Sequence, residues 1–167
     1  MEYMDVIRQR YSVRAYKPDA VEDEKLRKVL EAGVIAPTAC NLQPFKLVVM
    51  PVDKHIDTLR KICPASFFTQ APLVIGIYAD MDEAWVRKDG KSFADVDAAI
   101  VMDHIILAAT DLGLGTCWIG AFNPQAAREA VSLGGGYEPV AFTPLGYPAS
   151  NSPVRQRKPL ADMVIYL

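Results

Sequence analysis

Three arginines lie within seven residues near the start of the chain, at Arg8, Arg10 and Arg14, and Ser12 stands between them. A guanidinium group binds phosphate through a planar pair of N–H donors, and a nearby serine hydroxyl adds a further donor. The segment RQRYSVRAY, residues 8–16, is therefore a candidate phosphate-binding segment. Taken alone, it fits a solvated helix end with surface ion pairs better.

A second basic cluster lies near the end of the chain, where PVRQRKP contains Arg155, Arg157 and Lys158. The formal net charge of the chain is -2, so both clusters are local features and not parts of a general basic surface. That balance gives no reason to expect nucleic acid or an anionic membrane as a partner. Two arginine-rich loops can close on one phosphate group, but their spacing does not show that they meet.

Two further segments have the composition of a ligand site. APTACNLQPFKLVV, residues 36–49, places short polar side chains in a turn between a predicted helix and a predicted strand. Such a turn offers backbone amides to a planar ligand, although it can also simply end one element and begin the next. GLGTCWIGAFNP, residues 113–124, joins glycines that allow close backbone approach to the apolar walls of Trp118 and Phe122. Ordinary helix-to-strand punctuation, with Trp118 in the core, is the alternative.

The elements that must position these segments are predicted from apolar periodicity and from short apolar runs bounded by prolines. The predicted helices cover residues 1–10, 22–35 and 95–112, with a short one beginning at Pro124, and the predicted strands cover 46–50, 73–79 and about 139–145. The segment PVDKHID, residues 51–57, is predicted as a loop with His55 in solvent.

The helix predicted over 95–112 is apolar on more than one face, so both of its sides are expected to be buried. In a chain of 167 residues this indicates a helix that lies against a second subunit as well as its own sheet. His104 within it is expected to be buried and hydrogen-bonded, and Cys117 to be a small buried thiol. The last residues, MVIYL, are apolar and β-prone, and a terminal strand of that kind needs a sheet to join.

The overall composition is that of a single soluble domain, residues 1–167, with 51% apolar and 23% charged residues. Its three cysteines lie far apart without metal-ligand spacing, so no metal site is predicted and a reducing compartment is indicated. We expect a cytoplasmic protein, because the first residues lack the apolar stretch of a signal peptide and no run approaches membrane-spanning length. Neither GxGxxG nor GxxxxGK[ST] is present, which argues against a Rossmann or P-loop nucleotide site.

The order of the segments resembles the FMN-dependent nitroreductase family. Five stretches match in family order over nearly the whole chain: RQRYSVRAY, APTACNLQPFKLVV, DVDAAIVMDHIILAATDLGLGTCWIG, LGYP (145–148) and RQRKPL (155–160). The resemblance implies an α+β nitroreductase-like fold, with a mainly antiparallel central sheet flanked by helices and a C-terminal strand exchanged within a homodimer. The chain is short for the family, so helical insertions that shape the substrate pocket of longer members are expected to be missing.

The resemblance also implies a role for each matched segment. The 5′-phosphate of FMN would be held by Arg10, Tyr11, Ser12 and Arg14, together with Arg155 and Arg157. The turn that reaches the flavin of the other subunit would supply Pro37, Thr38, Ala39, Asn41 and Gln43. The backbone of Ile119 and Gly120 would approach the isoalloxazine ring near N5. Arg8 falls outside the pattern and is expected at the surface or an interface, and within residues 61–71 only Ser66 and Gln70 are candidates for the pyrimidine ring.

The implied activity is that of an FMN-dependent oxidoreductase that uses NAD(P)H to reduce nitroaromatic compounds, quinones or related electron-poor acceptors by a ping-pong mechanism. No side chain need be a nucleophile or general base, because the chemistry belongs to the flavin. Phe67, Phe68 and Trp85 are expected on the substrate side. The alternative is a flavin-binding superfamily member with non-reductase chemistry or a sensing role. A structural dimer without cofactor would leave the matched segments unexplained together.

Overall fold

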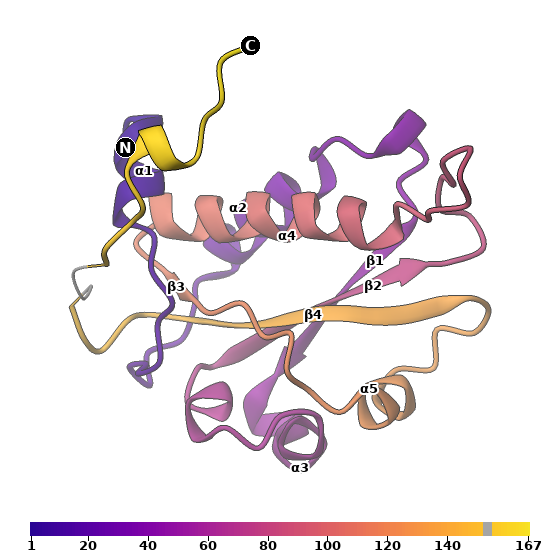
Figure 1. Cartoon of the computed structure of the whole chain (residues 1–167). Helices are drawn as coiled ribbons and strands as arrows, with labels where there is room; N and C mark the ends of the chain where they lie inside the picture. The colour runs from indigo at the N-terminus through magenta and orange to yellow at the C-terminus, as the bar shows by residue number, and fades with distance from the viewer. Residues whose placement is uncertain (152–154) are drawn as a thin grey trace.

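The computed structural model describes residues 1–151 and 155–167, and these form an antiparallel sheet with helices on both faces (Figure 1). The strands are β1 (Phe45–Pro51), β2 (Leu73–Asp80), β3 (Gly115–Thr116) and β4 (Tyr137–Gly146), in the order β1-β2-β4-β3. The helices are α1 (Tyr3–Gln9), α2 (Asp23–Val34), α3 (Val52–Ile62), α4 (Ala94–Asp111) and α5 (Pro124–Ala130). Short 3-10 turns cover Ala39–Asn41, Ser66–Thr69 and Leu160–Asp162. The α+β prediction is confirmed.

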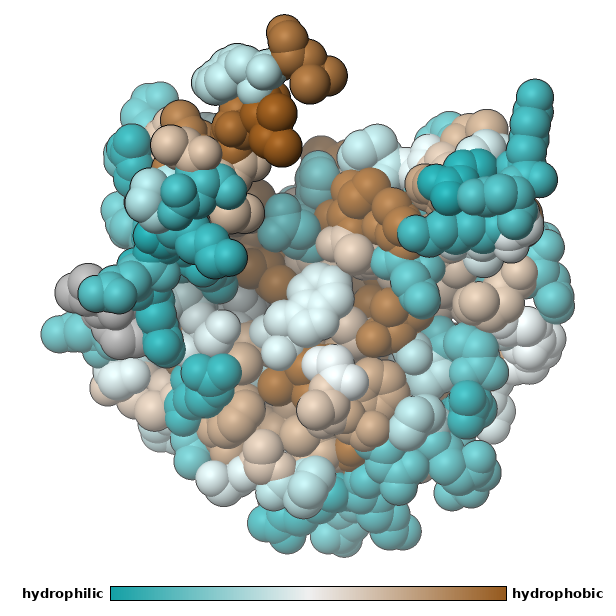
Figure 2. Space-filling view, viewed as in Figure 1, coloured by the Kyte–Doolittle hydropathy of each residue, from teal (hydrophilic) through white to brown (hydrophobic). Residues whose placement is uncertain are grey.

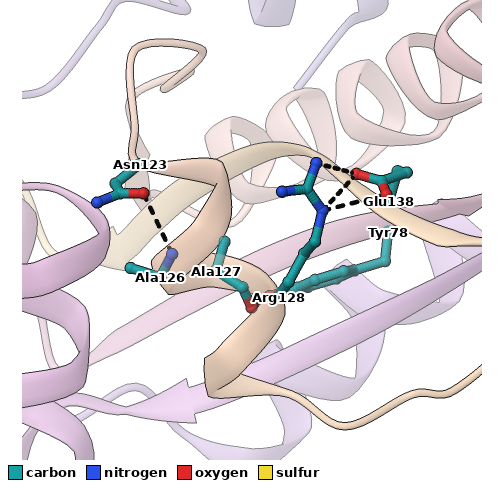
Figure 3. Close-up of polar contacts among 6 residues, drawn as sticks. All are labelled: Tyr78, Asn123, Ala126, Ala127, Arg128 and Glu138. Carbon is teal, nitrogen blue, oxygen red and sulfur yellow. Dashed lines mark hydrogen bonds and ion pairs between the residues drawn. The ribbon is translucent and has the colours of Figure 1, made fainter.

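The sheet separates two hydrophobic cores. Successive side chains of a strand point to opposite faces, so β2 sends Ile75 and Ile77 toward α2 and α4, and Val74 and Tyr78 toward α3 and α5. Because both faces of β2 are covered, its sequence LVIGIYA is almost continuously apolar. The hydroxyl of the buried Tyr78 donates to the carbonyl of Ala127 and ties α5 to this second core, while the Asn123 side chain caps the start of the helix (Figure 3).

The segment predicted as a loop, residues 51–57, instead leads into α3, so that prediction was wrong. Val52, Leu59 and Ile62 are the buried residues of this helix, and its remaining surface is mostly charged. Leu59 and Ile62, two of its three buried residues, lie beyond residues 51–57, so that segment alone does not show the helical periodicity. His55 is exposed, as expected, and has non-helical angles (φ -129°, ψ 18°) within the helix.

Helix α4 buries one face against the sheet and α2, and its other face is open in the single chain. Val101 and Ile105 are fully buried, whereas Ala99 and Asp103 are exposed. His104 lies on the open face, half-buried, with its Nδ1 atom 2.9 Å from the carbonyl oxygen of Ile100. The expected burial is therefore found on one side of the helix only, and burial of the second side by another chain stays a prediction. None of the helices within residues 1–151 and 155–167 is long and apolar enough to cross a membrane.

The C-terminal residues form no strand within the described parts of this chain. After the turn at Leu160–Asp162 the chain is extended away from the sheet, and Ile165 and Tyr166 are each 87% exposed. These apolar side chains have no cover within the single chain, so the exchanged C-terminal strand stays a prediction.

Candidate functional site

The arginine-rich segment that follows α1 is fixed against the edge of the sheet. The N–H of Val13 donates to the carbonyl of Thr116 at 2.8 Å, and Ser12 forms a parallel bridge with the same residue. Gly115 allows this close approach, because a Cβ atom there would lie 2.7 Å from Cγ2 of Val13. The backbone on either side of Ser12 is therefore held by β3 rather than free in solvent.

The polar side chains of this segment lie close to Cys117, which directly follows β3. Burial raises the pKa of the Cys117 thiol, and the positive charges of Arg14 and Arg10 together with the Ser12 hydroxyl oppose that shift. A buried thiol with a raised pKa is neutral and unreactive, which agrees with the prediction for Cys117. Arg10, Ser12 and Arg14 therefore share one neighbourhood, in which Arg14 also lies 5.9 Å from the centre of the Phe67 ring.

The chain leaving β4 returns along this arginine-rich segment. The contacts are backbone hydrogen bonds of 2.8 Å between Lys17 and Tyr147 and between Ala149 and Ala15, and a bridge between Tyr16 and Pro148. The hydroxyl of Tyr11 then donates to the carbonyl of Ser150 at 2.5 Å. Arg155 and Arg157 follow a few residues later and are exposed. The pairing thus brings residues 147–150, which precede the second basic cluster, alongside the first cluster.

The turn between α2 and β1 lies at the other end of α4. The N–H of Ala39 donates to Oδ1 of Asp97, in the first turn of α4, at 2.9 Å. The hydroxyl of Thr38 accepts the N–H of Gln43 at 3.0 Å. Left-handed backbone is found at Cys40 (φ 51°), Asn41 (φ 56°) and Gln43 (φ 53°). Three such residues without a glycine are costly, so the surrounding bonds must hold the turn in this form.

The turn and the arginine-rich segment do not come together within one chain. The turn is anchored at Asp97, whereas Arg10 lines a cavity of about 160 Å³ with Thr110 and Gly113, at the C-terminal end of α4. Asp97 and Thr110 are thirteen residues apart on α4, which corresponds to about 20 Å along the helix axis. Of the predicted flavin contacts, Pro37, Asn41 and Gln43 are exposed beside that turn, far from the phosphate candidates.

Ile119 and Gly120 lie beyond β3, where the chain crosses to the α3 and α5 side of the sheet. Ile119 is buried and exchanges two backbone hydrogen bonds with Phe142 of β4, of 2.8 and 3.1 Å. Gly120 is exposed, and its N–H finds no acceptor within residues 1–151 and 155–167. Trp118 is 41% exposed, so it is not a core tryptophan. The turn therefore offers a free backbone donor beside an accessible aromatic ring.

Both the sequence and the fold of this chain match proteins of one known family. The model described as "Nitroreductase family" matches residues 7–67 and 62–147. The chain belongs to the nitroreductase family. A crystal structure of a nitroreductase family protein from Clostridium difficile 630 has a TM-score of 0.91 at 38% identity, covering 99% of this chain and 98% of that one.

Two further relatives of this nitroreductase chain carry names that bear on function. A putative nitroreductase from Desulfovibrio desulfuricans, solved in complex with FMN, has a TM-score of 0.87 at 30% identity, covering 100% of this chain and 97% of that one. A Thermus thermophilus protein named NADH dehydrogenase is 28% identical over 191 residues, covering 94% of this chain and 92% of the relative. The resemblance given by the five segments and the α+β nitroreductase-like fold that it implied are therefore confirmed, whereas the exchanged C-terminal strand stays a prediction.

The structure separates the three residues predicted on the substrate side of this nitroreductase. Phe68 is fully buried and packs edge-on against Phe142, with ring centres 6.3 Å apart, so its prediction was wrong. Phe67 is half-buried beside Arg14. Trp85 packs edge-on against Phe93 just before α4, with ring centres 4.8 Å apart, near the other end of the helix. Neighbouring residues of a 3-10 turn point to different sides, which explains why Phe68 and Phe67 differ.

The remaining candidates lie at the surface. Arg8 is exposed, and its guanidinium nitrogen lies 3.7 Å from a carboxylate oxygen of Asp5, as expected for a residue outside the matched pattern. Ser66 and Gln70 are exposed and line a surface hollow with Arg60.

Sequence reasoning did not find two contacts that shape the site, the Ala39–Asp97 hydrogen bond and the Tyr11–Ser150 hydrogen bond. The available signal for the first was that Asp97, one of two acidic residues in the first turn of α4, lies among the buried apolar residues of that helix.

Proposed function

We propose that this chain is an FMN-dependent NAD(P)H oxidoreductase whose flavin sites are shared between the two subunits of a homodimer. Membership of the nitroreductase family supports the reaction class, and the FMN bound to the Desulfovibrio desulfuricans relative supports the cofactor. The name NADH dehydrogenase of the Thermus thermophilus relative supports a pyridine nucleotide as electron donor. The observation that carries the proposal is that Arg10 and Arg14, on the segment held at the sheet edge, form no ion pair with any described residue.

Arg10 and Arg14 fit the phosphate end of FMN. Among the described residues neither forms an ion pair, whereas Arg8 pairs with Asp5 and Arg128 pairs with Glu138. Two guanidinium groups without carboxylate partners, on a backbone fixed by β3, suit a phosphate dianion that accepts several charge-assisted hydrogen bonds. The Ser12 hydroxyl would add a neutral donor, and Arg155 and Arg157 would close on the same group from the returning chain. Tyr11 would act by holding that returning chain.

The shared site follows from the separation of the two halves. A turn about 20 Å along α4 from the arginine-rich segment does not reach the ligand of its own chain, so the other subunit would supply it. The surface available for pairing is apolar. On α4 it is a shallow depression lined by Asp95, Val96, Ala99, Ile100, Asp103 and His104. Close to it, Val34 and Ile35 at the end of α2 and Leu42 in the turn are exposed.

The C-terminal segment supplies a second apolar surface for the homodimer. Its exposed apolar side chains form the brown projection at the top of Figure 2, well away from the sheet. Exposed apolar surface of this kind marks a protein interface. We infer that the segment packs on the partner subunit, as the resemblance to the family implies.

When bound, FMN would supply the redox chemistry, taking hydride from NAD(P)H and passing electrons to a nitroaromatic compound, a quinone or another electron-poor acceptor in a ping-pong cycle. The chain would contribute binding and orientation. The free N–H of Gly120 would donate to the flavin ring, and Pro37, Thr38, Ala39, Asn41 and Gln43 would contact it from the partner. Of the predicted substrate-side residues, Phe67 and Trp85 remain in this proposal. Their location at opposite ends of α4 again requires two chains to form one pocket.

The test is the visible absorption spectrum of the purified protein, followed by denaturation to identify any released flavin. We expect two flavin bands that bleach with NADH or NADPH under anaerobic conditions and return when a quinone is added. Flavin that neither nucleotide reduces would favour the non-reductase alternative. A colourless protein that FMN neither colours nor stabilises against heat would overturn the proposal.

A further inference from the structure

We propose that Asp97 is a positioning residue that holds the 37–43 turn in the form that completes the flavin site of the partner subunit. The inference rests on the proposed function, because it assigns the turn to a site shared between two chains. Asp97 itself would touch neither FMN nor the acceptor, since its carboxylate is enclosed between the turn and the first turn of α4.

The environment of Asp97 is unusual for a carboxylate. Its residue exposure is 2%, and its Oδ1 atom accepts the N–H of Ala39 at 2.9 Å. Its Oδ2 atom is buried and finds no hydrogen-bond partner within residues 1–151 and 155–167. A buried carboxylate oxygen without a partner is destabilising, although the N-terminal end of a helix favours negative charge. The residue is therefore not explained by stability, and the bond to Ala39 is what it provides.

The turn needs such an anchor because its own backbone is strained. Cys40, Asn41 and Gln43 all have left-handed angles, and the turn is largely exposed. Its other two side-chain bonds, from the Gln43 N–H to the Thr38 hydroxyl and from the Gln43 side-chain amide to the Asn41 carbonyl, join the turn only to itself. The bond from Ala39 joins it to α4. Asp97 consequently decides where the turn lies on the surface that the partner would cover.

Two substitutions remove the same bond from opposite sides. Asp97→Ala removes the acceptor. Ala39→Pro removes the N–H donor, and proline is compatible there because Ala39 is the first residue of the 3-10 turn and follows the extended Thr38 (φ -130°, ψ 160°). Asp97→Asn keeps an oxygen for the Ala39 N–H and serves as the conservative variant. Asp53→Ala is the matched control, because it removes an exposed carboxylate from the first turn of another helix, α3, away from the proposed interface.

The experiment counts FMN sites in heterodimers made by co-expressing two differently tagged chains and purifying on both tags. One chain carries Arg10→Ala and Arg14→Ala, and the other carries Asp97→Ala. If Asp97 acts on the partner's site, the intact arginine-rich segment of the second chain meets the intact turn of the first. We then expect one high-affinity FMN site per heterodimer by fluorescence titration, against two in the wild-type dimer. Each variant homodimer should bind FMN about tenfold more weakly or worse.

The outcomes separate this inference from the proposed function. A reference heterodimer pairs the arginine variant with a chain carrying Thr38→Ala and Asn41→Ala. If the reference binds no FMN tightly, the shared site itself is wrong. If the reference binds one FMN but the Asp97→Ala heterodimer binds none, Asp97 acts within its own chain and the inference is wrong. Wild-type binding by the Asp97→Ala homodimer, or an equal loss in Asp53→Ala, would also overturn it.

Folding of the variants does not leave the question open. Purification on both tags selects chains that fold and pair, so failure of Asp97→Ala would show as an absent heterodimer. Ala39→Pro then carries the test, because it leaves α4 unchanged. Paired with the arginine variant, Ala39→Pro should give one high-affinity FMN site per heterodimer. The Ala39→Pro homodimer should have none. Asp97→Asn should restore two sites per homodimer, and failure of that rescue would contradict a role through the Ala39 bond.

Discussion

The two ends of α4 carry the two halves of the proposed flavin site, and they are built differently. At the C-terminal end, the arginine-rich segment is tied by backbone hydrogen bonds to β3 and to residues 147–150 of the same chain. At the N-terminal end, the 37–43 turn is exposed, left-handed at three residues and tied to α4 by its bond to Asp97. Side chains that bind phosphate need a backbone held rigidly by their own chain. A turn that contacts the ligand of another chain must instead project from the surface of its own subunit.

The comparison predicts its largest effect for a substitution that touches neither half. Ile100 lies half-buried on the open face of α4, and Ile100→Asp places a carboxylate in the proposed interface. Burying an unpaired charge there should give monomers, and FMN affinity should fall by roughly 100-fold or more although every arginine is intact. Light scattering coupled to size exclusion measures the first effect, and FMN titration the second.

The control for Ile100→Asp is Lys54→Glu, which changes charge at an exposed residue of α3. It should leave both the oligomeric state and FMN affinity unchanged. A monomeric Ile100→Asp protein that binds FMN as tightly as the wild type would show that one chain completes the site. The difference drawn between the two ends of α4 would then be mistaken.

The next effect belongs to the arginine end alone. Replacing Arg10 and Arg14 by alanine together should weaken FMN by roughly 100-fold, since each charge-assisted hydrogen bond contributes about 1.5–3 kcal/mol. Riboflavin lacks the phosphate, so its affinity should be the same in the variant and the wild type. Arg128→Ala is the control, because its guanidinium is already paired with Glu138 at 2.7 Å (Figure 3). An equal loss of affinity for riboflavin and FMN would mean that the two arginines stabilise the folded segment and do not bind the phosphate.

A smaller effect is expected on stability. Gly115→Ala would place a Cβ atom 2.7 Å from Cγ2 of Val13, which is almost fully buried, so one of the two must move. Overpacking of this kind costs about 1–3 kcal/mol, measured as the change in the free energy of unfolding in urea. Gly120→Ala is matched in chemistry, and its Cβ atom would come no closer than 3.7 Å to Trp118. Equal stability of the two variants would mean that the arginine-rich segment is not packed tightly against β3.

The elements with a strong local pattern were predictable from the sequence. The continuous apolar run LVIGIYA became the central strand β2, and the all-round apolar pattern of residues 95–112 became α4. Helix α3 was missed, because its buried residues Val52, Leu59 and Ile62 are separated by charged positions. The candidate site could be proposed from the sequence as a set of segments, because the segments resemble those of the family in order, and its residues stay a prediction.

The placement of individual side chains was not predictable. Phe67 and Phe68 are adjacent and identical in type, and only the packing against Phe142 decides which one is buried. The Ala39–Asp97 and Tyr11–Ser150 hydrogen bonds join residues that are 58 and 139 positions apart in the chain, so no local sequence pattern contains them. Spacing likewise could not show that residues 11–17 pair with residues 147–150, which precede the second basic cluster.

The smallest effect is expected at the C-terminal end of α4, where the hydroxyl of Tyr11 donates to the Ser150 carbonyl and holds the chain that leaves β4. Tyr11→Phe removes this hydroxyl and should weaken FMN by roughly three- to tenfold, since one hydrogen bond contributes about 0.5–1.5 kcal/mol. Tyr16→Phe is the matched control, because its hydroxyl donates to Val13 within the same segment. Tyr16→Phe should lower the free energy of unfolding by about 0.5–1.5 kcal/mol, because it also removes one hydrogen bond. It should leave FMN affinity nearly unchanged.

A double-mutant cycle decides how Tyr11 acts. If its hydroxyl matters only because it brings Arg155 and Arg157 to the phosphate, Tyr11→Phe should have no further effect on FMN affinity once both arginines are alanine. Additive losses would instead mean that Tyr11 contacts the cofactor directly, as the resemblance to the family implied. In that case the arginine end would be a set of independent ligands, and the pairing with residues 147–150 would serve stability alone.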